Sequence, residues 1–429
     1  MNKAAQKVQR TYLTLLLLNT LAASLIWGIN TLFLLDAGLN NTQAFAANAF
    51  FTFGFMIFEI PTGVVADLRG RRTSYLLGVI TLTLSTLLYL FMWYRSVPFW
   101  GWALSSMLLG LGFTFFSGAT QAWLVDALAH SGFKEKLESV LAKGEIVEGA
   151  AMLIGSVTGG IIAQATNLGV PYVIRAALLV LNLIFAFLLM KDLGFKPADE
   201  KDPIKEVKII IAGSIRYGLR NPPVRWIMLA APFTGGVTIY AFYAMQPYLL
   251  QLWGNERAYG VAGLAAAIVA GAQIAGGLAV PYIGRIFRRR TTVLLTCEVV
   301  SVLVLAIVGL VPNFWVVVTL LIFWGLMFSA ATPVRQTYLN GLIPTEQRAT
   351  VLSFDSLFGS SGGVVFQPLL GKAADVWSYP TSYIFSAAIQ ALAPPFTWLA
   401  RREKSASDLI RSENDAKGET KLATSASTS

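Results

Sequence analysis

Apolar runs long enough to cross a lipid bilayer recur along this whole sequence. A helix needs roughly 20 predominantly apolar residues to span the hydrocarbon core. Only helices and closed barrels can satisfy their backbone polar groups in lipid, so the sequence predicts an all-α membrane protein. The twelve predicted spans, with boundaries uncertain by about two to four residues, are 12–35, 44–65, 73–94, 98–126, 144–165, 171–190, 224–252, 258–283, 291–311, 313–337, 351–373 and 379–400.

Composition agrees with a membrane protein and argues against an enzyme. Charged residues make up 13% of the chain, against about 25% in a typical soluble domain. The single cysteine, Cys297, excludes an internal disulfide, and the single histidine, His130, argues against a zinc cluster of histidines and cysteines. We find no nucleophile–base pair and no phosphate-binding glycine loop. We therefore expect no catalytic residue, no metal, no cofactor and no use of ATP.

The net charge of +10 is better explained by a lipid bilayer than by nucleic acid, because the positive residues flank the apolar runs. Lysine and arginine favour cytoplasmic loops. Placing both termini in the cytoplasm leaves four basic residues on the far side, namely Arg95, Arg175, Arg257 and Lys372. The N-terminus begins like a signal peptide, but the run 12–35 is too long for one. We expect a multi-pass protein of the plasma membrane (the cell inner membrane), with both termini cytoplasmic.

The chain also carries traces of an internal duplication. Six spans lie on each side of a polar segment at 191–223. At an offset of 215, Gly110, Gln121 and Leu124 recur as Gly325, Gln336 and Leu339, and at 218 the turn 71–73 recurs as 289–291. Two parallel halves of this kind suit alternating access around a site near the bilayer midplane. The predicted units are a bundle at 1–190, a cytoplasmic linker at 191–223, a second bundle at 224–400 and a disordered cytoplasmic tail at 401–429.

The loop between the second and third spans carries the most specific motif. Its residues Gly63, Asp67, Gly70, Arg71 and Arg72 resemble, position by position, the signature loop of the major facilitator superfamily. The resemblance covers about residues 10–400. It implies the major facilitator fold, in which twelve transmembrane helices form two pseudo-symmetric six-helix bundles.

The resemblance gives this loop a part in gating. It implies that Asp67 faces the N-terminus of the eleventh span, near Val351, where a carboxylate is favourable. Arg71 then requires an acid, and Asp126 at the end of the fourth span is the best candidate. The alternative is that the arginines only anchor the loop on the cytoplasmic side. The predicted conformational lock comprises Gly63, Asp67, Gly70, Arg71, Arg72 and Asp126.

The residues ahead of this motif, 58–63, resemble those of bacterial drug:proton antiporter-like members of the superfamily. Two other motifs of those members are incomplete here. Thr158 stands where the proline of a glycine–proline pair is expected, and Ser106 stands where an arginine is expected. The match to the antiporter motif is therefore partial, and the missing arginine puts the usual proton relay in doubt.

Carboxylates within spans are costly and are functional candidates by default. We select Glu59, Asp36 and Glu148 as candidates for proton coupling. Glu145 and Asp355 open helices, where a negative charge is favourable in any case. Glu298 lies within the ninth span, and no carboxylate stands out at the midplane.

The resemblance also implies that the first, fourth, seventh and tenth helices line a central cavity. Side chains at helical spacing there are aromatic, with scattered amides and hydroxyls, which suits an amphiphilic or hydrophobic solute. The alternative is that these rings face lipid or neighbouring helices. The predicted lining residues are Asn19, Trp27, Asn30, Phe113, Phe116, Thr120, Tyr240, Tyr243, Gln246, Trp324 and Phe328.

These observations favour a secondary active transporter that exports hydrophobic or amphiphilic small molecules, in the manner of multidrug efflux, by proton antiport and alternating access. We expect it to act as a monomer. A proton-coupled importer of a small metabolite is the nearest alternative. A membrane sensor that keeps the fold without transport is an alternative of another class, and it would be expected to carry a substantial extra domain.

Overall fold

The computed structural model of the chain describes residues 2–195, 208, 212–344 and 347–410, and its regular elements there are helices. The helices of the first half follow one another in the sequence and are joined by short connections. They are α1 (Lys3–Trp27), α2 (Asn30–Asp36), α3 (Asn41–Arg69), α4 (Arg71–Arg95), α5 (Phe99–Thr114), α6 (Ala119–His130), α7 (Leu137–Ala165) and α8 (Gly169–Leu189).

The second half repeats this arrangement after a short π-helix, η1 (Ser214–Leu219). Its helices are α10 (Pro222–Trp253), α11 (Tyr259–Ile286), α12 (Arg290–Leu310), α13 (Phe314–Asn340), α14 (Arg348–Val376), α15 (Tyr379–Gln390) and α16 (Ala393–Arg402), followed by a 3-10 turn, η3 (Ala406–Asp408).

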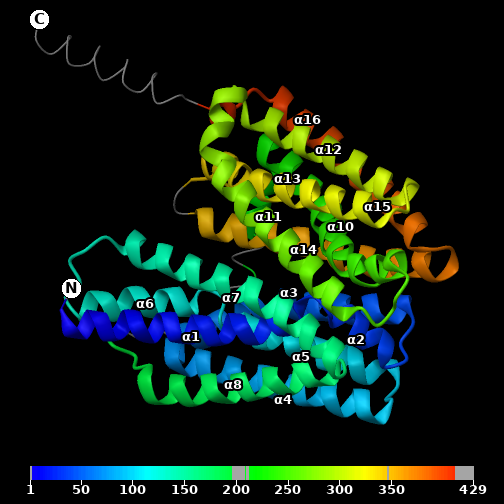
Figure 1. Cartoon of the computed structure of the whole chain (residues 1–429). Coiled ribbons are helices and arrows are strands. Elements are labelled where there is room, and N and C mark those ends of the chain that lie inside the picture. Colours follow the sequence, from blue (N-terminus) through cyan, green and yellow to red (C-terminus); the bar gives the residue numbers. More distant parts are fainter. Residues whose placement is uncertain (1, 196–207, 209–211, 345–346, 411–429) are drawn as a thin grey trace, which may run out of the picture.

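The helices gather into two bundles, one holding α1–α8 and the other α10–α16 (Figure 1). Among the described residues, ten helical segments are long and apolar enough to cross a membrane. The predicted all-α fold of two transmembrane bundles is confirmed. The linker predicted at 191–223 lies largely outside the described residues.

Three of the predicted spans are interrupted, although the sequence predicted each as one helix. The first divides at Gly28 and Ile29, the fourth at 115–118 and the twelfth at 391–392. In the fourth, Gly118 adopts a φ of +68°, a conformation that glycine reaches without steric cost. Each interruption frees backbone N–H and C=O groups that a continuous helix would have paired.

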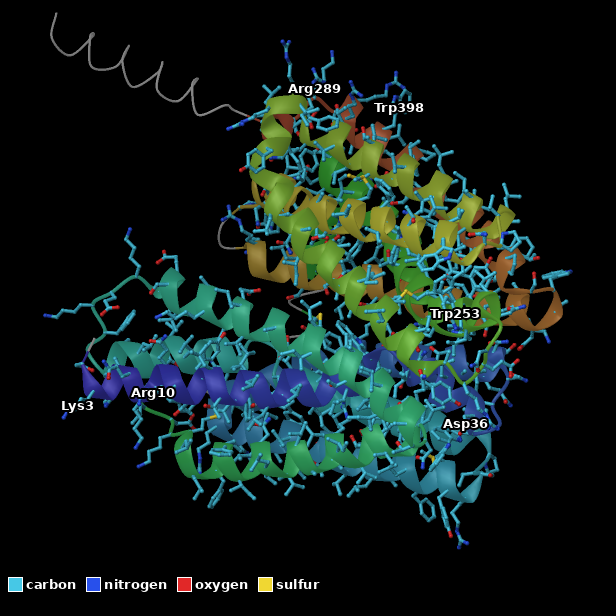
Figure 2. All side chains as sticks on the ribbon, in the orientation of Figure 1. Lys3, Arg10, Asp36, Trp253, Arg289 and Trp398 are labelled. Carbon is cyan, nitrogen blue, oxygen red and sulfur yellow. The ribbon has the colours of Figure 1, made fainter. Side chains whose placement is uncertain are left out.

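The two bundles approach each other at one end of the molecule and diverge toward the other. They meet at the end that carries Asp36 and Trp253, and they separate toward the end that carries Lys3 and Arg10 (Figure 2). We refer to these as the Asp36 end and the Lys3 end. Helix α3 packs on α14 and α7 packs on α11, and these two pairs form most of the contact between the bundles, with a smaller contact between α10 and α2.

The chain beyond α16 remains ordered as far as Ile410. Asp408 is 2% exposed, and its carboxylate accepts a hydrogen bond from the backbone N–H of Thr291 at 2.8 Å. Arg290 donates to the carbonyls of Ser407 and Leu409 at 2.6 and 2.7 Å. The predicted disorder of the tail therefore does not extend to residues 401–410, and residues 411–429 lie outside the described part of the chain.

Arg175 also departs from its predicted place on the far side of the membrane. It lies inside the first bundle and is 2% exposed. Its Nε donates to the hydroxyl of Thr86 at 3.0 Å, and one of its terminal nitrogens donates to the carbonyl of Ala22 at 3.1 Å. It is a buried cation and does not help to fix the orientation of the chain.

Candidate functional site

The signature loop forms the sharp connection between α3 and α4. Gly70 ends one helix and begins the next with a φ of +99°, which an L side chain rarely adopts. The carboxylate of Asp192, which follows α8, accepts a hydrogen bond from the backbone N–H of Arg72 at 2.8 Å. Arg72 also donates to the carbonyl of Phe187 at 2.8 Å. Asp192, whose role the sequence does not indicate, therefore holds the start of α4 against the end of α8.

Within the same loop, Arg71 forms an ion pair with Asp67 at 2.6 Å. The expected pairing of Arg71 with Asp126 remains a prediction for a state in which the Lys3 end is closed. A β-carbon added at Gly63 would meet no atom within 4 Å. The space beside Gly63 agrees with the divergence of the bundles at this end.

At the Asp36 end, a carboxylate of the second bundle caps a helix of the first. Asp375, near the end of α14, accepts hydrogen bonds from the backbone N–H groups of Asn41 and Thr42 at 2.9 and 2.7 Å. The hydroxyl of Thr42 donates to it at 2.5 Å. These are the first residues of α3, where the helix dipole favours a negative charge. The hydroxyl of Tyr379 also bonds to the side chain of Asn41.

The break between α1 and α2 provides a second contact between the bundles. The side chain of Gln246, on α10, donates to the carbonyl of Trp27 at 2.8 Å and accepts from the backbone N–H of Thr31 at 3.0 Å. Both backbone groups border the interruption and cannot pair within a helix. The ring of Trp27 lies 5.4 Å from that of Phe242 on α10. The predicted lining residues Trp27 and Gln246 thus meet, as neighbours across the bundle interface.

Next to this contact lies a buried group of amides and hydroxyls. Asn30 accepts from the hydroxyl of Tyr172 at 2.9 Å and donates to Asn48 at 3.0 Å. Gln367, on α14, donates to Thr52 on α3 at 3.3 Å. Asn30 therefore belongs to a group of hydrogen-bonded side chains in the first bundle. This group lies close to the surface that contacts the second bundle, where Gln367 bonds to α3.

Two of the predicted lining residues lie in helix-packing interfaces instead. Phe116 packs edge-on against Tyr75 at 4.8 Å between ring centres and lies against Gly78. Tyr240 is fully buried, donates to the hydroxyl of Ser382 at 2.6 Å, and contacts Phe45 at 4.6 Å between ring centres. In this conformation both rings pack against neighbouring helices, which is the alternative that the helical spacing had left open.

Four further residues were predicted to line the central cavity. Phe113 packs edge-on against Phe51 at 5.7 Å, and Tyr243 packs on Phe242 at 5.5 Å. The hydroxyl of Thr120, on α6, donates to the carbonyl of Phe116 in the break before that helix, at 3.5 Å. Asn19 is half-buried on α1.

Trp324 and Phe328, by contrast, do line a cavity, and it lies within the second bundle. Their rings stack at 6.4 Å between centres. The cavity has a volume of about 90 Å³ and is walled by α10, α12, α13, α15 and α16. Its charged lining residues are Glu298 and Arg335.

The candidates for proton coupling lie on three different helices. Glu59, on α3, accepts a hydrogen bond from Ser117 at 3.0 Å. Asp36 is exposed at the end of α2 and accepts from the indole N–H of Trp93 at 2.8 Å. Glu148 is half-buried on α7. They are not brought together by any hydrogen bond that the structure describes.

The structure adds ionic groups that our sequence reasoning did not select. Arg335 and Asp355 form a two-pronged ion pair between α13 and α14, with both distances 2.6 Å. The carboxylate of Glu298 accepts from the hydroxyl of Thr397 at 2.8 Å. Each of these charged residues could be recognised in the sequence as an ionisable group inside an apolar run. The sequence does not reveal which residue pairs with it. Within the described ranges, no group of three or more His, Cys, Asp and Glu residues could hold a metal ion.

Comparison with known proteins agrees with this arrangement. The model of the Major Facilitator Superfamily matches residues 12–289 and 253–426. The multidrug resistance protein MdtG of Salmonella paratyphi A is 23% identical over 363 residues, covering 82% of this chain and 84% of the relative. The protein of the same name from Dickeya zeae is 22% identical over 277 residues, covering 63% of this chain and 65% of the relative.

Solved structures resemble the fold at low sequence identity. The nucleoside transporter NupG superposes with a TM-score of 0.75 at 11% identity, covering 93% of this chain and 99% of that chain. An inward-facing, unoccupied bacterial homologue of the human lysosomal transporter Spinster superposes with a TM-score of 0.70 at 14% identity, covering 96% and 100%. Family and fold are those of transporters, not of enzymes. The chain is therefore a multi-pass membrane protein that belongs to the major facilitator superfamily.

Proposed function

We propose that the protein is a secondary active transporter that exports hydrophobic or amphiphilic small molecules by alternating access. The observation that carries the proposal is the asymmetric contact between the bundles, which is made at the Asp36 end and opens toward the Lys3 end (Figure 2). Side-chain hydrogen bonds such as those of Asp375 and Gln246 hold the closed end. Such bonds can break and re-form as one bundle rocks against the other.

The chemistry of the interface supports an amphiphilic solute. The rings of Trp27, Phe242 and Tyr243 lie together where the two bundles meet. Apolar walls with a few convergent polar groups are typical of small-molecule sites. The relatives that match along most of the chain are named as multidrug resistance proteins, and this agrees with export.

We further propose that protons drive transport, with Glu59, Asp36 and Glu148 as coupling candidates, and that the protein works as a monomer in the plasma membrane. The Lys3 end would then face the cytoplasm, since it carries Lys3, Lys7 and Arg10 together with the arginines of the signature loop. In that orientation the structure corresponds to an inward-facing state.

Export can be tested in a bacterial strain that lacks its main efflux pumps. We expect expression of the protein to raise resistance to several lipophilic compounds. We also expect inverted membrane vesicles to accumulate those compounds when an inward-acid proton gradient is applied. Resistance and accumulation that equal those of the empty vector would contradict export.

The second candidate is a proton-coupled importer of a small metabolite. The buried amide network around Asn30 and Asn48 favours it, because such groups could recognise a polar solute. Uptake of labelled nutrients into intact cells, accompanied by unchanged drug susceptibility, would select this function. A membrane sensor would show neither resistance nor uptake.

A further inference from the structure

The cavity inside the second bundle contains a carboxylate whose hydrogen bonding is incomplete. Glu298, on α12, uses one oxygen to accept from Thr397 at 2.8 Å. Its second oxygen is buried and has no hydrogen-bond partner among the described residues. An ionised oxygen without a hydrogen-bond donor is unfavourable in a buried setting. A ligand that brings a positive charge would remove that cost.

When Glu298 is ionised, the cavity carries one uncompensated negative charge. Arg335 is the only other charged residue among those that line it. Its guanidinium is already paired with Asp355 through two contacts of 2.6 Å. The ion pair is neutral as a unit, so Glu298 is the uncompensated charge. A singly charged cation is the ligand that balances the site.

The remaining walls suit a cation with an apolar body. Trp324 and Phe328 present stacked rings to the cavity, and aromatic faces attract ammonium groups. The volume of about 90 Å³ compares with roughly 10–15 Å³ needed for one water molecule. The cavity therefore has room for a substituted ammonium group, and the rest of a larger solute would extend beyond it.

We propose that this cavity, the Glu298 pocket, binds the ammonium group of a cationic amphiphile. The Glu298 carboxylate acts as the counter-ion, and Trp324 and Phe328 lie beside the cation. Such a site rests on the transport function proposed above and specifies the chemical class of its solute. All of its lining residues belong to the second bundle.

The chain provides its own reporter, because its single cysteine, Cys297, lines the same pocket. The experiment uses the purified full-length protein and two small thiol reagents of opposite charge. These are 2-aminoethyl methanethiosulfonate, a cation, and 2-sulfonatoethyl methanethiosulfonate, an anion. Each forms a disulfide with the Cys297 thiolate and releases methanesulfinate. Intact-protein mass spectrometry gives the two labelling rates.

We expect the cationic reagent to label Cys297 faster than the anionic one. Glu298→Gln should reduce the cationic rate by about tenfold and abolish the preference, since a fixed charge raises the local concentration of its counter-ion. Glu145→Gln makes the same change on an exposed part of α7 and should leave both rates unchanged. No labelling of the wild-type protein, or equal rates for the two reagents, would overturn the proposal. So would a preference that survives Glu298→Gln.

Protection of Cys297 supplies a second test that needs no variant. Benzyltrimethylammonium should slow labelling, whereas neopentylbenzene, which has the same shape without the charge, should not. If Glu298→Gln fails to fold, the comparison of these two compounds still tests whether the pocket selects a cation. Equal protection by the two compounds would contradict the proposal. Labelling is measured without transport, so the two proposals can fail separately. A cation-selective pocket in a protein that exports nothing refutes export alone, whereas export without protection refutes the pocket alone.

Discussion

At the scale of single residues, Arg175 is the clearest case of a charge held by neutral partners. Its guanidinium bonds to the hydroxyl of Thr86 and the carbonyl of Ala22, while one terminal nitrogen has no hydrogen-bond partner among the described residues. The planar group reaches two different helices, α4 and α1, from α8. A lysine ammonium cannot reproduce that geometry.

We therefore predict that Arg175→Lys lowers the free energy of unfolding by about 2 kcal/mol, through the loss of one charge-assisted hydrogen bond. Thermal unfolding of the purified protein, followed by tryptophan fluorescence, measures the change. Arg257→Lys, at an exposed position, serves as the matched control. A melting temperature equal to that of the wild type would show that the two bonds contribute little.

At this scale the sequence could supply candidates but not their partners. Glu298 and Asp355 were both recognisable as carboxylates in apolar surroundings. Thr397 and Arg335, which contact them, lie 99 and 20 residues away along the chain. The pairing depends on how the helices pack, and a linear pattern does not contain that information.

Among the helices, the two aspartates that follow α8 and α16 perform the same task in each half. Asp192 accepts from the N–H of Arg72 at the start of α4, and Asp408 accepts from the N–H of Thr291 at the start of α12. The two aspartates lie 216 positions apart in the chain. That value falls within the range of offsets that revealed the duplication, so a fuller search for the repeat could have found both.

We predict that Asp408→Ala lowers the free energy of unfolding by about 1 kcal/mol, the usual cost of losing a helix cap. Asp408→Asn should cost less, because an asparagine oxygen can also accept from the helix N-terminus. Thermal unfolding of the three proteins, compared at one pH, tests this order. If the alanine and asparagine variants were equally destabilised, the charge of Asp408 would matter more than its role as a cap.

Glycines offer a second prediction about helix packing. A β-carbon at Gly159, on α7, would overlap the backbone carbonyl of Leu25 on α1, whereas one at Gly63 would meet nothing within 4 Å. We expect Gly159→Ala to lower the free energy of unfolding by about 1–3 kcal/mol, the usual cost of overpacking. Gly63→Ala should keep or slightly raise stability, by up to about 1 kcal/mol, because alanine favours helix. The reverse order in melting temperature would contradict the packing described here.

The positions of the helices were predictable because length and apolar composition determine what can span a bilayer. The breaks within them were not. Gly28 and Gly118 interrupt helices, yet Gly155 and Gly159 lie within one. Whether a glycine breaks a helix depends on what lies against it. At the first break, Gln246 of the other bundle satisfies the freed backbone groups.

In the whole molecule, the Asp36 end is held by a carboxylate from one bundle on a helix N-terminus of the other. Asp375 contributes this charge to α3. At the Lys3 end, Asp67 is predicted to do the same for α14 when that end closes. The roles of the two bundles are exchanged between the two ends. The first bundle supplies the helix N-terminus at the Asp36 end and the carboxylate at the Lys3 end.

We predict that Asp375→Ala shifts the equilibrium toward a state that is open at the Asp36 end. Hydrogen bonds to a charged group contribute about 1.5–3 kcal/mol each, so the population ratio should change by about tenfold or more. Spin labels at Lys7→Cys and Arg288→Cys, in a Cys297→Ser background, report on the Lys3 end. Their separation should shorten as that end closes.

Asp67→Asn should move the same labels the other way, toward longer separations. Glu256→Ala removes an exposed carboxylate near the Asp36 end and should leave the distances as they are. Distances that are insensitive to Asp375→Ala would mean that the helix cap does not hold this end closed.

Because Asp375 and Asp67 would act on opposite ends of one equilibrium, their defects should cancel rather than add. A cell that carries a crippled Asp375 variant is then expected to regain function through second mutations near residues 63–72, more than 300 positions away in the gene product. Genetic suppressors would thus show that the two ends of the molecule are coupled, without any structural measurement.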